Sequence, residues 1–198
     1  MYSIVTTDPL VSPATAQELI DWARLDSDDP KIASSLLTAT RLAISFLKLE
    51  LLPRTYTLKY EDWPIVGTAG GSRLSRCTYS SKLRIDIPYA NTISITSVTV
   101  NGVVLAATDY KIIEGKPDKI QFETVGYNDT ENTALEMVYS SGYGATAVNI
   151  PGPIIQAIVI CAGYIHAHSG GCDTGNAIQQ SGAAELLRPY AVMGGLVF

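Results

Sequence analysis

The chain has 198 residues, which suffices for one domain with a substantial hydrophobic core. Its 14 lysines and arginines stand against 19 aspartates and glutamates, giving a formal net charge of −5. A surface that neutralises DNA phosphates needs a basic excess, so this composition disfavours direct duplex binding. Apolar residues make up 46% of the chain and charged residues 17%. These proportions suit either a protein that covers its surface with other subunits or one with a large β-rich core.

The sequence predicts no secretory signal, no membrane span and no disulfide framework. The first ten residues contain neither a basic segment nor an apolar stretch, so we expect no secretory signal. The longest apolar candidate, residues 154–165, is too short to cross a membrane. Cys77, Cys161 and Cys172 are odd in number and irregularly spaced, which is typical of a chain made in a reducing cytosol without a disulfide framework.

Two helices are predicted at the N-terminus. Either Ser12-Pro13 or a capping box of Thr15 and Glu18 begins a short first helix. Asp29-Pro30 is a second start signal, and Pro53 is a stop signal. Between them, a period near 3.6 predicts a longer helix that extends to Leu51. Its apolar face comprises Ala33, Leu36, Leu37, Thr40, Ile44, Leu47 and Leu51.

From residue 54 the period changes to two, which is typical of half-buried strands. Asn101-Gly102 lies between two such runs and predicts a tight hairpin. The region 54–140 is therefore predicted to be all β, in a small sandwich or a barrel-like sheet. The predicted strands are 55–60, 83–87, 93–100, 103–105, 110–113, 119–122 and 134–139.

Helical signals return after residue 141. Pro151 and Pro153 begin a third helix, whose inner face covers residues 154–165 and which ends near His168. Residues 169–182 are polar and glycine-rich, so a mobile loop is expected there. One or two helical turns follow at 183–187, and the last eight residues are apolar.

The order of elements predicts an α+β fold, in which a small helical bundle carries a β-rich insertion. Residues 1–53 supply the two N-terminal helices, and residues 54–140 form the insertion. Residues 141–198 supply the third helix, the loop and the tail, and complete one continuous domain with the N-terminal helices.

Candidate chemistry is weak throughout. His166 and His168 lie near Cys161 and Cys172, but their spacing matches no standard zinc pattern, and packing explains a cysteine within an apolar helix. No nucleophile-elbow sequence is present, and the glycine-rich stretch 67–72 lacks the Gly-Lys-Ser/Thr ending of a phosphate loop. We therefore expect no catalytic residue, metal or cofactor, and no enzymatic activity.

Several short motifs follow one another in a characteristic order. An acidic pair, Asp28-Asp29, precedes the long helix, and alternating strands, a Gly-Tyr-Gly turn and a proline-initiated helix come after it. The motifs are RTYTL at 54–58, IDIP at 85–88, ISITSV at 93–98, DYKI at 109–112, YSSGYG at 139–144, the Ile-Pro step at 150–151 with the helix 154–165, and LRPY at 187–190.

In this order and spacing the chain resembles the head-tail connector (adaptor, or head-completion) proteins of tailed bacteriophages. The resemblance covers most of the chain, although the segment from His166 to Gly171 departs from the aromatic and charged helix end common in that family. It implies a structural virion protein that is made in the bacterial cytoplasm and resides in the neck, at the head-tail interface.

The resemblance also implies partners. Twelve copies would form a ring beneath the dodecameric portal protein, extend the DNA channel and present a surface to a stopper or tail-completion protein. DNA would pass through the lumen without sequence-specific binding. The candidate portal or partner contacts are Leu187, Arg188, Pro189, Tyr190, Leu196, Val197 and Phe198.

Two other readings stay open. The first is a different phage neck or tail component, such as a stopper or tail terminator; those are usually β-barrels without the long N-terminal helix pair. The second is a small hydrolase or carbohydrate-binding domain whose β insertion would be the active module. The absence of a credible catalytic set in the sequence disfavours it.

Overall fold

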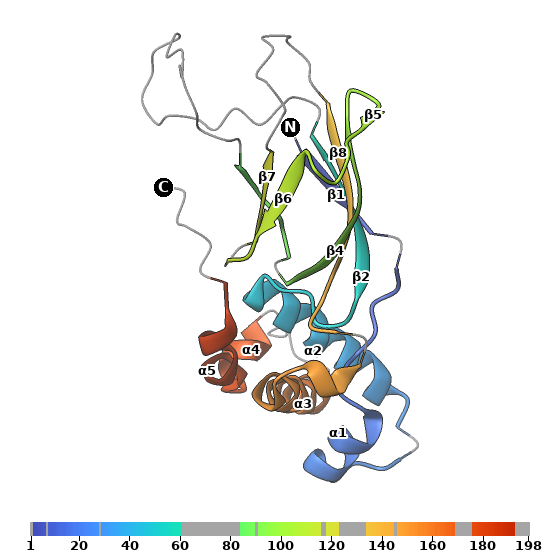
Figure 1. The fold of residues 1–198 in the computed structure, drawn as a ribbon. Coiled ribbons are helices and arrows are strands. Elements are labelled where there is room, and N and C mark those ends of the chain that lie inside the picture. The colour runs from blue at the N-terminus through green and yellow to red at the C-terminus, as the bar shows by residue number, and fades with distance from the viewer. Residues whose placement is uncertain are drawn as a thin grey trace.

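The computed structural model describes residues 2–6, 8–27, 29–60, 84–89, 91–115, 118–122, 134–144, 146–168 and 176–192. Its helices gather at one end of the molecule and its strands at the other (Figure 1). The α+β class predicted from the sequence is confirmed, while the boundaries at 53 and 140 stay predictions. Among the helices described, none has the length and apolar character needed to cross a membrane.

Helix α1 (Ala16–Ala23) begins at the predicted capping box. The Thr15 hydroxyl accepts a hydrogen bond from the Glu18 N–H at 3.2 Å, and the Glu18 carboxylate accepts one from the Thr15 N–H at 2.7 Å. These two bonds satisfy backbone donors that have no partner inside the helix. The alternative start at Ser12-Pro13 is therefore wrong.

Helix α2 (Lys31–Leu47) is shorter than its apolar pattern predicts. Lys48 takes a left-handed conformation, with φ of 57°, and its N–H donates to the Ile44 carbonyl, which ends the helix. The predicted extension to Leu51 is wrong. Leu49 and Leu51 continue the apolar pattern because tertiary packing buries both, at 2% and 1% exposure.

The third predicted helix is present as α3 (Gly152–Ala167). It follows a short 3-10 turn (Ala147–Asn149) and packs against α1, α2 and α5 (Ala183–Leu187), which a second 3-10 turn (Arg188–Tyr190) continues. A further helix, α4 (Ala177–Gln180), lies within the segment 169–182 that was expected to be a mobile loop, so that expectation is wrong for its second half. Residues 169–175 lie outside the described residues. Together these helices enclose one apolar core.

A five-stranded antiparallel sheet forms most of the β region. The strand order is β1-β2-β8-β4-β5, and β8 pairs with β2 on one side and β4 on the other. Strand β1, at the N-terminus, was not predicted and pairs with β2 from Tyr2↔Tyr60 to Val5↔Thr57. The strands are β1 (Tyr2–Val5), β2 (Arg54–Tyr60), β4 (Thr92–Val100), β5 (Val103–Val104) and β8 (Leu135–Ser141).

A three-stranded sheet completes the β region. It comprises β3 (Arg84–Asp86), β7 (Lys119–Phe122) and β6 (Tyr110–Ile113), in that order. Both sheets contribute to a single apolar core, as the predicted sandwich requires. The larger sheet supplies Tyr56, Leu58, Val98, Leu135, Met137 and Tyr139, and the smaller sheet with its flanking residue supplies Ile85, Ile87, Ile120 and Phe122.

The end of β8 is tied to the segment that links α2 to β2. Gly142 has φ of +154°, and a Cβ added there would lie 2.7 Å from the Leu52 carbonyl carbon. The Gly142 N–H donates to the Asn91 carbonyl, and the Tyr143 N–H donates to the Leu51 carbonyl. Only glycine permits this close approach of two backbones.

We expect Gly142→Ala to lower the free energy of unfolding by about 1–3 kcal/mol, because the new methyl group must displace backbone atoms. Urea denaturation followed by circular dichroism would measure the change. Gly152→Ala is the matched control, since a Cβ at Gly152 has no neighbour within 4 Å. Equal stabilities for the two variants would contradict the packing described for Gly142.

Candidate functional site

A buried carboxylate lies where the helical end of the molecule meets the sheets. Glu50 follows α2 and is only 1% exposed. Its side chain accepts hydrogen bonds from the Arg54 guanidinium at 3.3 Å, from the Leu51 N–H at 3.3 Å and from the Tyr56 hydroxyl. We call Glu50, Arg54 and Tyr56 the Glu50 cluster. Because a buried charge is costly unless it is paired, these bonds are what makes its burial possible.

The Glu50 cluster also fixes the N-terminal connector between β1 and α1. Arg54 Nη2 donates to the Asp8 carbonyl at 2.8 Å, and the Asp8 carboxylate accepts a hydrogen bond from the Thr55 N–H at 2.6 Å. The Arg54 guanidinium lies 5.7 Å from the centre of the Tyr56 ring, within the range of a cation–π contact. The connector is therefore attached to the start of β2 by two polar contacts of Asp8.

Tyrosine rings extend the cluster into the sheet core. Tyr56 stacks on Tyr89 and on Tyr139, with ring centres 5.1 and 5.7 Å apart. Burial raises the pKa of Tyr56, and the neighbouring Glu50 carboxylate, which accepts its hydrogen bond, raises it further. Tyr56 is therefore a neutral hydrogen-bond donor at physiological pH.

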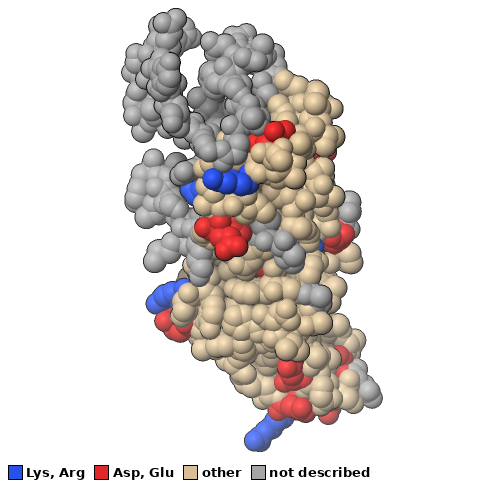
Figure 2. Space-filling model, viewed as in Figure 1, with Lys and Arg blue, Asp and Glu red and all other residues tan. Residues whose placement is uncertain are grey.

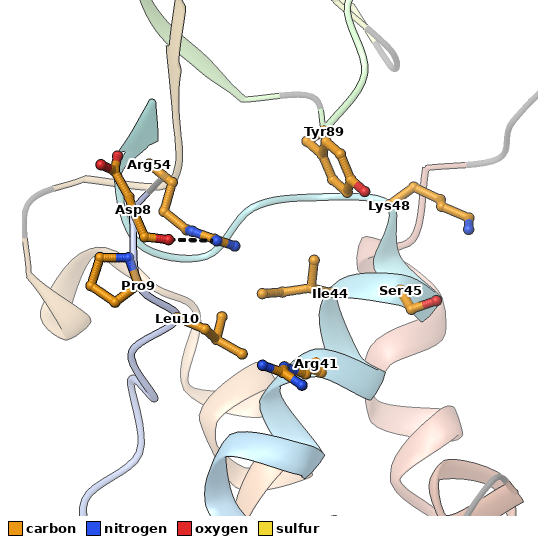
Figure 3. A pocket seen from close by; sticks show the side chains of 9 residues that line it. All are labelled: Asp8, Pro9, Leu10, Arg41, Ile44, Ser45, Lys48, Arg54 and Tyr89. Atoms are coloured by element: carbon orange, nitrogen blue, oxygen red, sulfur yellow. Dashed lines mark hydrogen bonds between the residues drawn. The ribbon is translucent and has the colours of Figure 1, made fainter. Parts of the chain in front are cut away.

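A pocket of about 390 Å³ lies beside the cluster, between α2 and the connector; we call it the α2 pocket (Figure 3). Leu10 and Ile44 face each other across it, and Pro9 and Tyr89 add apolar surface. Its polar lining is mainly basic and consists of Arg41, Ser45, Lys48, Arg54 and Asp8.

The basic residues of the α2 pocket are not equivalent. Arg54 is held by Glu50 and Asp8, although its buried Nε atom has no hydrogen-bond partner among the described residues. Arg41 on α2 and Lys48, which directly follows the helix, are exposed, and neither side chain makes a hydrogen bond or ion pair with any residue that the structure describes. Lys48 points outward at the rim of the pocket in Figure 3. Two cations are thus available to a ligand.

The structure places the predicted partner contacts in different environments. Leu187 is 1% exposed and packs in the helical core, so its side chain supports the segment from inside. Arg188 and Pro189 are exposed, and Arg188 pairs with Glu185 at 3.1 Å. Tyr190 is half-buried. The remaining candidates, Leu196, Val197 and Phe198, lie outside the described residues.

The histidines that could have suggested a metal site have other partners. His166 Nε2 lies 2.8 Å from an Asp29 carboxylate oxygen, which joins the end of α3 to the start of α2. The Lys31 N–H and then His166 lower the pKa of Asp29. His168 Nδ1 lies 2.9 Å from the Tyr164 carbonyl oxygen. Within the residues the structure describes, no three potential ligands gather into a metal site.

Sequence reasoning did not find Glu50, Arg41 or Lys48. The only local signal for Glu50 is an acidic residue inside the apolar run from Leu47 to Leu52. Its side-chain partners are two residues of the following strand. The pocket also needs the connector, whose residues Asp8 to Leu10 come nearly forty residues before the end of α2. No motif in the sequence brings these segments together.

The overall arrangement is similar to that of chains in solved gene transfer agent particles. The first comparison is with a chain of the "Virion of native gene transfer agent (GTA) particle", with 16% identity over 98% of both chains and a TM-score of 0.65. A chain of the "Neck of empty GTA particle computed with C6 symmetry" has 15% identity over 99% of this chain and 98% of that one, with a TM-score of 0.66.

A third match, from the "Neck of native GTA particle computed with C12 symmetry", has 16% identity, covers 100% of this chain and 98% of that chain, and has a TM-score of 0.65. No family model and no curated protein sequence matches the chain. At these identities the likeness shows a shared fold, and it extends over essentially the whole length of both chains. It confirms the fold that the sequence resemblance implies.

We expect Glu50→Ala to lower the free energy of unfolding by about 3–5 kcal/mol, because it leaves the Arg54 guanidinium partly buried without its carboxylate. Urea denaturation would measure the loss. The control is Glu185→Ala, which breaks the exposed ion pair to Arg188 and should cost less than about 1 kcal/mol. If Glu50→Ala is as stable as the control, the Glu50 cluster does not contribute to the stability of the fold.

Proposed function

We propose that this chain is a structural subunit of a virion neck: a head-tail adaptor whose copies form a ring beneath the portal. The observation that carries the proposal is the fold shared over full length with neck chains of gene transfer agent particles. The order of sequence motifs supports the same role, since it resembles phage head-tail connectors. The ring would extend the DNA channel and join the capsid to the tail.

A ring of twelve copies is the most economical assembly. One of the compared necks was computed with C12 symmetry and another with C6 symmetry, and twelve copies are compatible with both. A ring of identical chains uses two different surfaces of each copy, because each interface is heterologous and closes by rotation. The proposal therefore requires two complementary faces on one chain.

The described surface suits assembly. Large apolar side chains remain exposed on several elements, where neighbouring subunits of the proposed ring would cover them. They are Val11, Trp22, Leu37, Val103, Val104, Ile112 and Val148. Few charges interrupt the face of the molecule drawn in Figure 2. The acidic balance of the chain would let DNA slide through a lumen, since like charges discourage adhesion.

Competing functions have less support. A stopper or tail terminator would be built mainly on a β-barrel, whereas here α1, α2 and α3 form a helical core of their own. A small hydrolase would need a nucleophile beside a base. Cys161, the free cysteine that the structure describes, is buried, and burial raises the pKa of its thiol to about 11, which makes it a poor nucleophile at neutral pH.

Light scattering of the chain with and without its purified cognate portal tests the proposal. We expect a complex with about one copy of the chain per portal subunit, formed because the portal templates the ring. The control replaces the portal with an unrelated protein ring of similar size. Failure to associate, under conditions in which the portal binds other neck proteins, would favour the stopper or terminator reading.

The predicted C-terminal contacts can be tested without damage to the described fold. The Val192 N–H donates to the Leu47 carbonyl, so a truncation after Val192 keeps this contact and removes residues 193–198. We expect the truncation to weaken portal binding about tenfold or more, because apolar interface anchors carry much of the affinity. Isothermal titration calorimetry would measure it. Unchanged affinity would remove the tail from the portal interface.

Arg188→Ala and Tyr190→Ala examine the neighbouring exposed segment in the same titration. If only the truncation lowers the affinity for the portal, the contact is confined to residues 193–198. If only the point variants lower it, the contact is confined to residues 188–190.

A further inference from the structure

The α2 pocket has the chemistry of a site for a carboxylate next to an apolar side chain. Its apolar part is formed by Leu10 and Ile44, facing each other, with Pro9 and Tyr89 beside them. Arg41 and Lys48 supply two cations that no described residue neutralises. Such a combination favours a peptide surface that carries both acid and hydrocarbon.

The same chain presents a surface with the opposite character at α1. Asp21 and Asp26 are exposed, and Glu18 lies one turn before Trp22. Trp22 is 48% exposed although part of its ring packs against Gly163 of α3. Acidic side chains gather at this end of the molecule, at the bottom of Figure 2, where a basic side chain also projects and where Figure 1 shows α1. We call Glu18, Asp21, Trp22 and Asp26 the acidic α1 surface.

We propose that the acidic α1 surface of one copy docks in the α2 pocket of the next copy. This inference rests on the proposed ring, which needs two different and complementary faces on each chain. The contact would place carboxylates beside Arg41 and Lys48 and the exposed half of the Trp22 ring against the apolar side of the pocket. Aromatic and arginine side chains in such pairings are the usual anchors of interfaces.

A second copy fits the pocket better than a nucleic-acid phosphate does. The apolar part of the pocket, with Leu10 and Ile44 facing each other, offers nothing to a phosphate backbone. The chain as a whole is acidic, at −5, so repulsion opposes DNA elsewhere on its surface. A copy of the chain supplies acidic and aromatic groups together, and the match of charge gives the contact its orientation.

Charge reversal tests the contact in the complex with the portal. We expect Arg41→Glu with Lys48→Glu to reduce the assembled fraction about tenfold or more, and Asp21→Lys with Asp26→Lys to do the same. Combining all four substitutions restores opposite charges across the interface and should recover assembly. Lys59→Glu with Lys119→Glu is the charge control for the Arg41 and Lys48 pair, because it changes the net charge by the same amount in the β region, where each lysine has an ion-pair partner on a neighbouring strand.

A second measurement does not depend on the portal. A carbodiimide joins a lysine amine to a carboxylate that it contacts. We expect it to link Lys48 of one copy to Asp21 or Asp26 of another, in a concentrated mixture of isotopically light and heavy chains examined by mass spectrometry. Cross-links between copies that involve the exposed Lys59 measure the background from random encounters.

The outcomes separate the two proposals. If the chain does not bind the portal, the adaptor role fails, and the mixed-isotope cross-link alone decides the contact. If the portal complex forms but Lys48 links to no α1 carboxylate in either setting, the contact is overturned while the adaptor role stands. If the variant with Arg41→Glu and Lys48→Glu loses portal binding, and the unchanged chain gives no cross-link between copies, the pocket binds an acidic segment of the portal instead. The contact is also overturned if the variant that combines all four substitutions fails to recover assembly.

Discussion

The burial of one carboxylate constrains the whole arrangement. Glu50 lies at 1% exposure between two apolar cores, one formed by helices and the other by two sheets. An unpaired charge in this position would cost several kcal/mol. The Glu50 carboxylate accepts hydrogen bonds from Arg54, Tyr56 and the Leu51 N–H. These donors reach it only when β2 leaves the end of α2 in the observed direction. The two cores are therefore held in the arrangement that satisfies the carboxylate.

Other contacts return to the same short segment between α2 and β2. The C-terminal segment attaches to the Leu47 carbonyl through the Val192 N–H, and the end of β8 attaches to the Leu51 carbonyl through the Tyr143 N–H. Arg54 reaches the connector that follows β1 through the Asp8 carbonyl. Segments from the beginning, middle and end of the chain thus meet at residues 47–54. These contacts fix the sheets to the helices at one short segment.

The periodic parts of the fold could be predicted from the sequence because their causes are local. The Thr15 capping box and the apolar face of α2 each lie within a few helical turns, and a tight turn at Asn101-Gly102 joins β4 to β5. Strand β1 was missed because its partner is more than fifty residues away, in β2. The end of α2 was missed because the left-handed turn at Lys48 leaves the apolar pattern unbroken. The Glu50 cluster and the α2 pocket depend on such long-range pairings.

The low identity of the compared necks decides which properties can be transferred to this chain. At 15–16% identity a TM-score near 0.65 is maintained by apolar patterning, since many different apolar residues can fill equivalent core positions. Surface residues do not have to fill core positions. The structural similarity therefore shows a shared architecture and does not identify the residues that contact partners. Arg41 and Lys48 must therefore be judged on this chain's own chemistry. Arg41 and Lys48 pair with no side chain in the described part of the chain and lie beside an apolar recess, and the proposed contact with a second copy would give both cations a partner.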